Sequence, residues 1–301
     1  MTDVTQTAAQ VAPATSNGRA RTSRYRVLGE GSSVLISAVT IAVLFLIWWL
    51  ATRQGLRYPT WSLEQGFHWG ETPLLKPLFL PKPESIWLAF QQAMAGDLDN
   101  STLVGHFLAS LGRVGGAFVL AVIIGIPVGI SMGVSRIARG VFDPPLEFYR
   151  PLPPLAYLPL MIIWFGIGER NKIILLFLAI FAPVALAARA GVRSVSQEQI
   201  QAALSMGASR FQVVRHVIVP GALPEILVGL RIGMGVGWTT LVAAEMVAAD
   251  AGLGKMVYNA SNFLRTDVVI LGIVAIGFVA YAFELLMRWA ERLLVPWKGR
   301  V

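Results

Sequence analysis

The sequence contains no cysteine, which excludes disulfides, thiolate metal sites and thiol catalysis. Charged residues are also scarce. They form 14% of the 301 residues, whereas hydrophobic residues form 55% and occur in long uninterrupted runs. This composition is typical of a protein that crosses a membrane several times and has no separate soluble domain of ordinary size.

Two further features narrow the range of possible functions. The sequence has no Gly-x-x-x-x-Gly-Lys-Ser/Thr loop, so it lacks the usual cradle for ATP phosphates. The net charge is +8, but the basic residues lie at the ends of apolar runs and not on one soluble face, which argues against nucleic-acid binding. These residues are better explained as signals of membrane topology.

Residues 1–30 contain little that could be buried and are interpreted as a disordered cytoplasmic tail. The apolar run 34–51 that follows is long enough to cross about 30 Å of hydrocarbon. It begins too late in the chain for a typical signal peptide, so residues 31–52 are predicted to form a retained first transmembrane helix.

Five further spans are predicted at about 107–133, 150–167, 172–192, 225–248 and 266–288. The expected fold is therefore all-α, with about six transmembrane helices. Residues 53–104 are predicted to form a periplasmic segment, and residues 105–301 a five-helix core.

The distribution of basic residues predicts the orientation, because Lys and Arg favour the cytoplasmic side. If both termini are cytoplasmic, sixteen basic residues lie on or near that side and nine lie on the other. The expected location is the inner membrane of a bacterium, as a multi-pass protein.

The segment 196–220, here called the coupling segment, is half polar although it lies between two predicted spans. Ser196 with Gln199, and Ser209 with Gln212, have the spacing of capping boxes, so two short helices with a bend near Gly207 are predicted. The pair is expected to end at Pro220. It could lie on the membrane surface as an amphipathic element, or it could dock a cytoplasmic partner through small residues.

The sequence QAALSMGASRFQVVRHVIVP resembles the coupling motif of binding-protein-dependent ABC importer permeases: Glu-Ala-Ala, three residues, Gly, nine residues, Ile-x-Leu-Pro. Gln stands where that motif has Glu, and two valines replace its Ile and Leu. The resemblance extends over about residues 80–297 and is to the nitrate/sulfonate/taurine group. It is carried by FYRPLPPLAYLPLMIIWFGIGE, LAIFAPVALAARAGVRSV, VPGALPEILVGLRIGMGVGWTTLVAAEM and VPWKG. The residues implied in ATPase coupling are Gln201, Ala202, Ala203, Gly207, Ala208, Ser209, Phe211 and Pro220.

This resemblance implies the type I (MetI-like) permease fold and a subunit that moves taurine or a related small sulfonate from periplasm to cytoplasm. Alkanesulfonate, nitrate and bicarbonate are the alternative substrates. The implied partners are a second copy of the permease, two cytoplasmic ATPase subunits that bind ATP and Mg²⁺, and a periplasmic substrate-binding protein. The chain itself would bind no cofactor.

Several features of the spans bear on a transport path. Glycines recur every four residues at 125–133 and again at 229–237, a pattern that favours close helix packing within one subunit or a moving interface. The proline-rich run 143–159 is interpreted as a broken element beside the path. The candidate path residues are Tyr157, Trp164, Trp238, Glu245 and Met246.

Ionisable groups in spans are costly, at roughly 2.5–3.5 kcal/mol each on insertion scales. Arg231 and Glu284 lie near predicted cytoplasmic ends and are interpreted as structural. Glu245 is expected near the outer face, either facing the path or in a structural salt bridge.

Two rival functions fit the sequence less well. Residues 129–133 match the Gly-x-Ser-x-Gly motif of serine hydrolases, but that motif needs a strand-to-helix turn and a positioned histidine, whereas Ser131 lies in a predicted helix. A secondary transporter would show an internal repeat, and none is apparent. No catalytic or metal-binding residues are predicted.

Overall fold

The computed structural model describes residues 34–52, 58–62, 66–70, 77–96 and 101–297. The chain divides into two compact units, residues 1–47 and 48–301, which are described separately. Helix α1 (Val34–Thr52) begins in the first unit and confirms the predicted first helix. The predicted tail, residues 1–30, lies outside the described residues.

The segment between α1 and the core contains a feature that the sequence analysis missed. Strands β1 (Tyr58–Ser62) and β2 (Gly66–Gly70) pair antiparallel, with Tyr58 opposite Gly70 and Ser62 opposite Gly66. Helix α2 (Pro83–Ala95) follows. Its buried residues Ala89 and Ala93 belong to the main hydrophobic core, so the predicted start of the core at residue 105 is too late.

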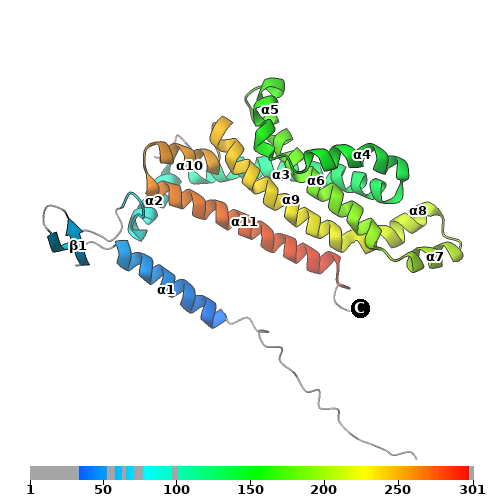
Figure 1. Ribbon diagram of the computed structural model, residues 1–301, viewed down its shortest axis with the longest axis horizontal. Coiled ribbons are helices and arrows are strands. Elements are labelled where there is room, and N and C mark those ends of the chain that lie inside the picture. The colour runs from blue at the N-terminus through cyan, green and yellow to red at the C-terminus, as the bar shows by residue number, and fades with distance from the viewer. Residues whose placement is uncertain (1–33, 53–57, 63–65, 71–76, 97–100, 298–301) are drawn as a thin grey trace, which may run out of the picture. The chain divides into compact units, whose positions relative to one another are not determined.

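The core of the second unit is built on helix α6 (Glu169–Ser194), which packs between α3 (Leu103–Val134) and α9 (Val219–Ala248) (Figure 1). Both glycine patterns face α6. A side chain added at Gly125 of α3 would contact Val184 of α6, and one added at Gly233 of α9 would contact Ile180 of α6. The two patterns therefore serve packing within one subunit, the first of the two alternatives.

Helices α10 (Leu253–Asn262) and α11 (Thr266–Leu294) complete the bundle, with α10 packed on α9 and α11. Within the described residues, five helices are long and apolar enough to cross a membrane: Leu35–Thr52, Leu103–Val134, Glu169–Ser194, Arg210–Val247 and Thr266–Leu294. The helical membrane fold is thus confirmed, with the small hairpin added to it.

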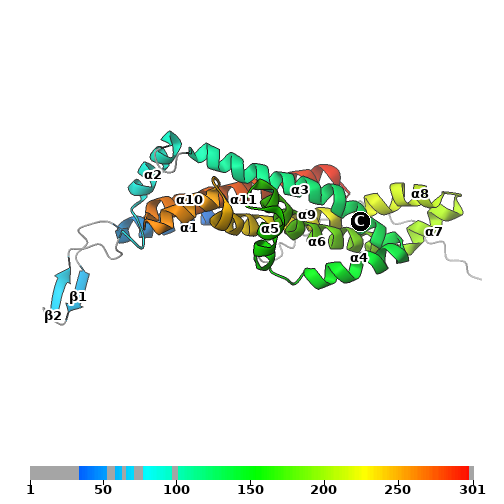
Figure 2. The same ribbon diagram turned by 90° about the horizontal axis from the view of Figure 1, so that it is seen from above.

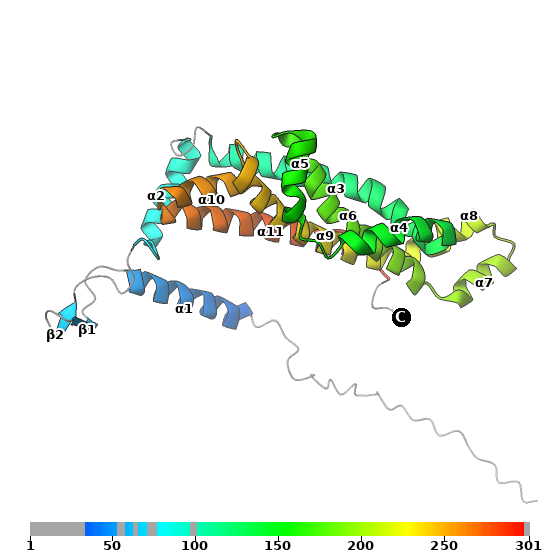
Figure 3. The same cartoon turned by 45° about the horizontal axis from the view of Figure 1, so that its top comes forward.

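The predicted span at 150–167 is wrong as a single crossing helix. Helix α4 (Arg136–Tyr149) ends before it, a turn follows, and then come a 3₁₀ turn, η1 (Pro154–Tyr157), and the short helix α5 (Leu158–Phe165), which projects from the bundle in Figure 3. Eight helical residues extend only about 12 Å. Closely spaced prolines remove the backbone donors that a continuous helix needs, as the interpretation of a broken element anticipated.

The coupling segment forms α7 (Gln197–Ser205), α8 (Arg210–Val213) and a π-helical turn, η2 (Val214–Ile218), that runs directly into α9. Figure 2 shows α7 and α8 at one end of the bundle, far from α10 and α2. Pro220 therefore does not end the helix pair as predicted. It occupies the first turn of α9, which continues directly from the π-helical turn, and Pro224 lies further along the same helix.

Candidate functional site

The bend of the coupling segment is a helix C-cap centred on Gly207. The Ala208 N–H donates to the Ala203 carbonyl at 3.1 Å and the Gly207 N–H to the Leu204 carbonyl at 2.9 Å, which is the Schellman pattern. Gly207 has φ +85°, a left-handed conformation that other residues adopt only with strain. The motif thus needs glycine here for backbone geometry.

Both predicted N-caps are present. The Ser196 hydroxyl accepts from the Gln199 N–H at 3.2 Å and begins α7. At α8 the capping box is complete: Ser209 accepts from the Gln212 N–H at 3.4 Å, and the Gln212 side chain accepts from the Ser209 N–H at 2.7 Å. These local bonds fix the shape of a segment that has little buried core.

The bend divides the apolar residues of the coupling segment into two sets. Ala203 is buried with Val213 against the bundle, so the prediction that Ala203 meets a partner is wrong. Met206 and Phe211 are 82% and 71% exposed, and Leu204 is also exposed. We call Met206 and Phe211 the docking surface. Large apolar side chains held outward together typify a binding site for another protein.

The remaining motif residues support this shape. Gln201, Ala202 and Ser209 are exposed on α7 and at the bend, and Ala208 and Pro220 are half-buried. The residue in place of the usual Glu, Gln201, thus stands where it can reach a partner.

A second candidate feature is a stripe of exposed residues along α9, here called the α9 stripe: Glu225, Ile232, Gly235, Thr239 and Met246. Their spacing of three, four or seven residues places them on one helix face. A side chain added at Gly235 would meet nothing within 4 Å. The middle of this face, at Gly235, is therefore open within the described part of the chain, whereas Glu225 lies beside Gly191 of α6.

Two cavities flank the α9 stripe. The first, about 480 Å³, lies between η1, α6 and α9 and is lined by Tyr149, Tyr157, Ile232 and Val236 among others. Burial raises the pKa of Tyr149, with a further contribution from Tyr157, so its phenol stays neutral at physiological pH. The lining of this cavity thus combines neutral phenols with one cation, Arg150.

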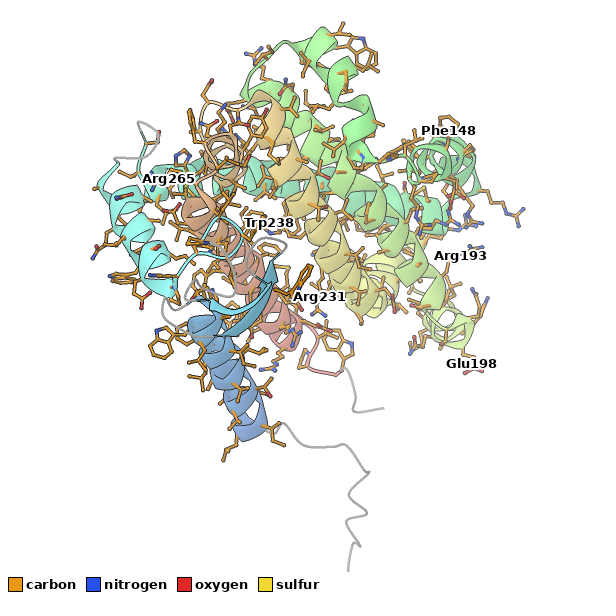
Figure 4. The ribbon with its side chains drawn as sticks, turned by 60° about the vertical axis from the view of Figure 1, so that its left-hand side comes forward. Phe148, Arg193, Glu198, Arg231, Trp238 and Arg265 are labelled. Carbon is orange, nitrogen blue, oxygen red and sulfur yellow. The ribbon has the colours of Figure 1, made fainter. Side chains whose placement is uncertain are left out.

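The second cavity, about 540 Å³, lies between α9 and α11 and includes Trp238, Thr239 and Phe283. Trp238 is buried, and its Nε1 has no hydrogen-bond partner among the described residues. Figure 4 shows Trp238 and Arg231 along the same helix. Arg231, also at this cavity, pairs with Glu284 at 3.4 Å and Glu291 at 2.8 Å, which agrees with the structural interpretation of Arg231 and Glu284.

The structure thus brings three of the predicted path residues to this region: Tyr157 at the first cavity, Trp238 at the second and Met246 on the α9 stripe. Trp164 is exposed on α5 and lines neither cavity.

The prediction that Glu245 faces the path is wrong. Its side chain is fully buried and forms the alternative, a structural salt bridge, with Arg113 Nη1 at 2.6 Å from Glu245 Oε1. The Ser110 hydroxyl and the Gly254 N–H also donate to the carboxylate, at 2.8 Å and 2.9 Å. Helices α3 and α10 thus supply the donors that hold this carboxylate in place.

Arg113 joins this carboxylate to a second one. Its Nε and Nη2 donate to the two oxygens of Glu169, at 2.6 Å and 2.8 Å, and its Nη1 also donates to the Ala251 carbonyl. Glu169 in turn accepts from Lys172 Nζ at 3.0 Å. We call Arg113, Glu169, Lys172 and Glu245 the ion network; it ties α3, α6 and α9 together.

The sequence analysis missed three members of the ion network. Arg113 and Lys172 were counted only as topology signals, although Arg113 lies inside a predicted span, where an unpaired charge is costly. The cost of burying Arg113 could have indicated that it has a buried partner. It could not identify Glu245 as that partner, because the two residues are 132 positions apart in the sequence.

Ser131, of the Gly-x-Ser-x-Gly match, lies within α3, and its hydroxyl donates to the Val128 carbonyl of the same helix at 2.7 Å. It is not on a strand-to-helix turn, so the structure gives no support to a hydrolase. Among the described residues, no group of three or more His, Asp or Glu side chains could hold a metal ion.

Comparison with known proteins agrees with this fold. The family model of binding-protein-dependent transport system inner membrane components matches residues 102–300. The taurine transport system permease protein TauC of Escherichia coli is 53% identical over 89% of this chain and 91% of its own length. The aliphatic sulfonates permease SsuC of E. coli, described as putative, is 34% identical over 79% of this chain and 87% of its own length.

Two more distant likenesses extend the comparison. The nitrate import permease protein NrtB of Synechocystis is 30% identical over 87% of this chain and 90% of its own length. A chain of the MetNI methionine ABC transporter, in an inward-facing conformation, has a TM-score of 0.56 at 22% identity and covers 64% of this chain and 95% of its own length, which shows likeness of fold. On the family match, this chain belongs to the binding-protein-dependent transport system inner membrane components.

Proposed function

We propose that this chain is the permease subunit of an ABC importer that moves taurine, or a related small sulfonate, from periplasm to cytoplasm. The observation that carries the substrate class is the 53% identity, over nearly the whole chain, to the taurine permease. Alkanesulfonate and nitrate remain candidates because permeases named for them are also relatives.

The coupling segment is proposed to bind a separate cytoplasmic ATPase subunit. The support is the exposed docking surface, Met206 and Phe211, presented by the Gly207 cap. In this arrangement ATP and Mg²⁺ are held by the partner, and this chain contributes no ATPase site of its own.

The path is proposed to lie along the α9 stripe, between two copies of the chain. The support is the open space at Gly235 and the two cavities beside it. A second copy could cover this face while leaving room for a small solute. The first cavity offers a zwitterion the neutral phenols of Tyr149 and Tyr157 together with one cation, Arg150, which can attract a sulfonate.

The transport test is reconstitution of this permease with its ATPase and binding protein in lipid vesicles. We expect ATP-dependent uptake of labelled taurine, competed by alkanesulfonates more strongly than by nitrate. Vesicles without the binding protein are the control. Uptake of nitrate in place of taurine would overturn the substrate assignment and leave the permease assignment intact.

The orientation is a separate proposal, with both termini and the coupling segment in the cytoplasm, based on the distribution of basic residues. Reporters fused after Gly191 or Ser205 should be active as cytoplasmic fusions, and one at Asn259 as a periplasmic fusion. A periplasmic result at Ser205 would overturn both the orientation and the proposed ATPase docking.

A further inference from the structure

A third cavity, about 500 Å³, lies beside the coupling segment and is distinct from the two that flank the α9 stripe. Three arginines from three helices line it: Arg139 of α4, Arg193 of α6 and Arg210 of α8. Segments far apart in the sequence thus bring like charges to one hollow.

The charge of this arginine cavity is not balanced by the described residues. No Asp or Glu lines it, and neither Arg193 nor Arg210 has an ion-pair partner among the described residues. The two nearest acids on α4, Asp143 and Glu147, pair with a different arginine, Arg189.

Two other groups near the cavity do not change this balance. Arg139 donates to the Met132 and Gly133 carbonyls, at 3.2 Å and 3.3 Å, but carbonyls leave its charge in place. Glu198 is exposed on α7 outside the lining, and Figure 4 shows it with Arg193 at the same end of the bundle. The cavity therefore favours an anion.

The rest of the lining is largely apolar and includes Val134, Ile200, Leu204 and Val214. A free inorganic anion would gain nothing from these side chains, whereas an amphiphile would bury its chain on them. Helix α3 has 32 residues, so it is about 48 Å long and exceeds a hydrocarbon core of about 30 Å. Its last turn, which reaches the cavity at Gly133 and Val134, then falls at headgroup depth.

We propose that the arginine cavity binds the phosphate headgroup of an anionic phospholipid from the leaflet on the coupling-segment side. Arg193 and Arg210 donate to the phosphate oxygens, and the start of the acyl chain packs on Val134 and Ile200. Arginine suits phosphate because its planar fork can donate two parallel hydrogen bonds. This inference rests on the proposed membrane placement, but not on the transported substrate.

The test uses the full-length permease in neutral phosphatidylcholine nanodiscs, titrated with phosphatidylglycerol and followed by native mass spectrometry. At about fivefold per arginine near an anionic surface, Arg193→Gln with Arg210→Gln should weaken binding about 30-fold. The charge-preserving pair, Arg193→Lys with Arg210→Lys, should retain most of the binding. Arg215→Gln, at an exposed arginine of the same segment outside the cavity, is the matched control.

Three other results would each overturn the proposal. An equal loss in Arg215→Gln would mean general surface attraction, and displacement of the lipid by millimolar inorganic phosphate would mean a free-anion site. Capture of the ATPase is also measured on Arg193→Gln alone, because Arg193 lies on α6 outside the coupling segment, and it should not change. If the double Gln variant loses the ATPase and keeps the lipid, the cavity is a protein contact. If instead Phe211→Ser abolishes capture and keeps the lipid, while the double Gln variant loses the lipid and keeps capture, docking and lipid binding are separate, as proposed.

Discussion

At the end of the bundle where α10 packs on α9, Arg113 donates to two carboxylates and a carbonyl, and its side chain is 5% exposed. At the other end, Arg193 and Arg210 are exposed beside a cavity without an acidic residue in its lining. One chain thus satisfies its charges internally at one end and leaves them available at the other. The difference indicates that the first end is built for rigidity and the second for contact with other molecules.

The largest effect is expected where the charges are internally satisfied. Glu245→Gln removes one of the two carboxylates that pair with buried Arg113. Because Glu169 still pairs with Arg113, the protein should be destabilised by somewhat less than the roughly 3–5 kcal/mol of a fully broken buried pair. The measurement is thermal unfolding in detergent together with the amount of protein in the membrane. Arg113→Met with Glu245→Leu is the matched control, because removing both charges leaves neither unpaired and should recover much of the stability.

That prediction has a clear opposite. Normal membrane levels and normal unfolding of Glu245→Gln, with transport alone lost, would mean that this carboxylate acts on the substrate.

A smaller effect is expected at the bend of the coupling segment. Gly207→Ala places a side chain in a left-handed conformation at a cost of roughly 1–2 kcal/mol, and the cap around it should loosen. ATPase capture should fall while membrane insertion is unchanged. Gly207→Asn is the control, because Asn tolerates this conformation and should keep more of the capture. Equal capture by wild type and Gly207→Ala would show that the cap does not shape the docking surface.

Gly207→Arg adds bulk and charge to the same strain and should abolish transport without preventing insertion. Comparing the Arg and Ala variants separates the backbone strain, which both share, from a direct clash with the ATPase, which only Arg adds.

The smallest effect on stability is expected for the docking surface itself. Phe211→Ser removes a side chain that is 71% exposed, so the stability should change by no more than about 0.5 kcal/mol. ATPase capture should nevertheless drop several-fold, as measured by co-purification. Arg215→Gln, an exposed change nearby, serves as the control. Marked unfolding of Phe211→Ser would mean that this ring stabilises the permease and has no docking role.

Much of this architecture could be predicted from the sequence, because long apolar runs determine spans and because capping and glycine signals are local. The span at 150–167 failed since hydropathy counts apolar residues and does not register that clustered prolines prevent one continuous helix. The prediction that Pro220 ends a helix was wrong because a proline in the first turn of a helix and a proline that ends a helix look alike in sequence.

The site was predictable to a lesser degree. Gly207 and the caps could be placed because they depend on neighbours within a few residues. Ala203 was assigned to the wrong side, since the bend at Gly207 decides which residues turn inward. The partners of Glu245 come from other helices, and no local pattern in one sequence pairs it with Arg113.

The π-helical turn, Val214–Ile218, has a mechanical consequence. With it, residues 210–247 form one rod of 38 residues, about 57 Å long, with the docking surface at one tip and the ion network near the other. The far tip is clamped by Arg113, so a push on the near tip can tilt the whole rod or be taken up at the turn, where the widened backbone can shift its hydrogen-bond register. The α9 stripe lies between these two points, so under the proposed ATPase docking the stiffness of this five-residue turn would set how much of a displacement at Phe211 reaches the stripe.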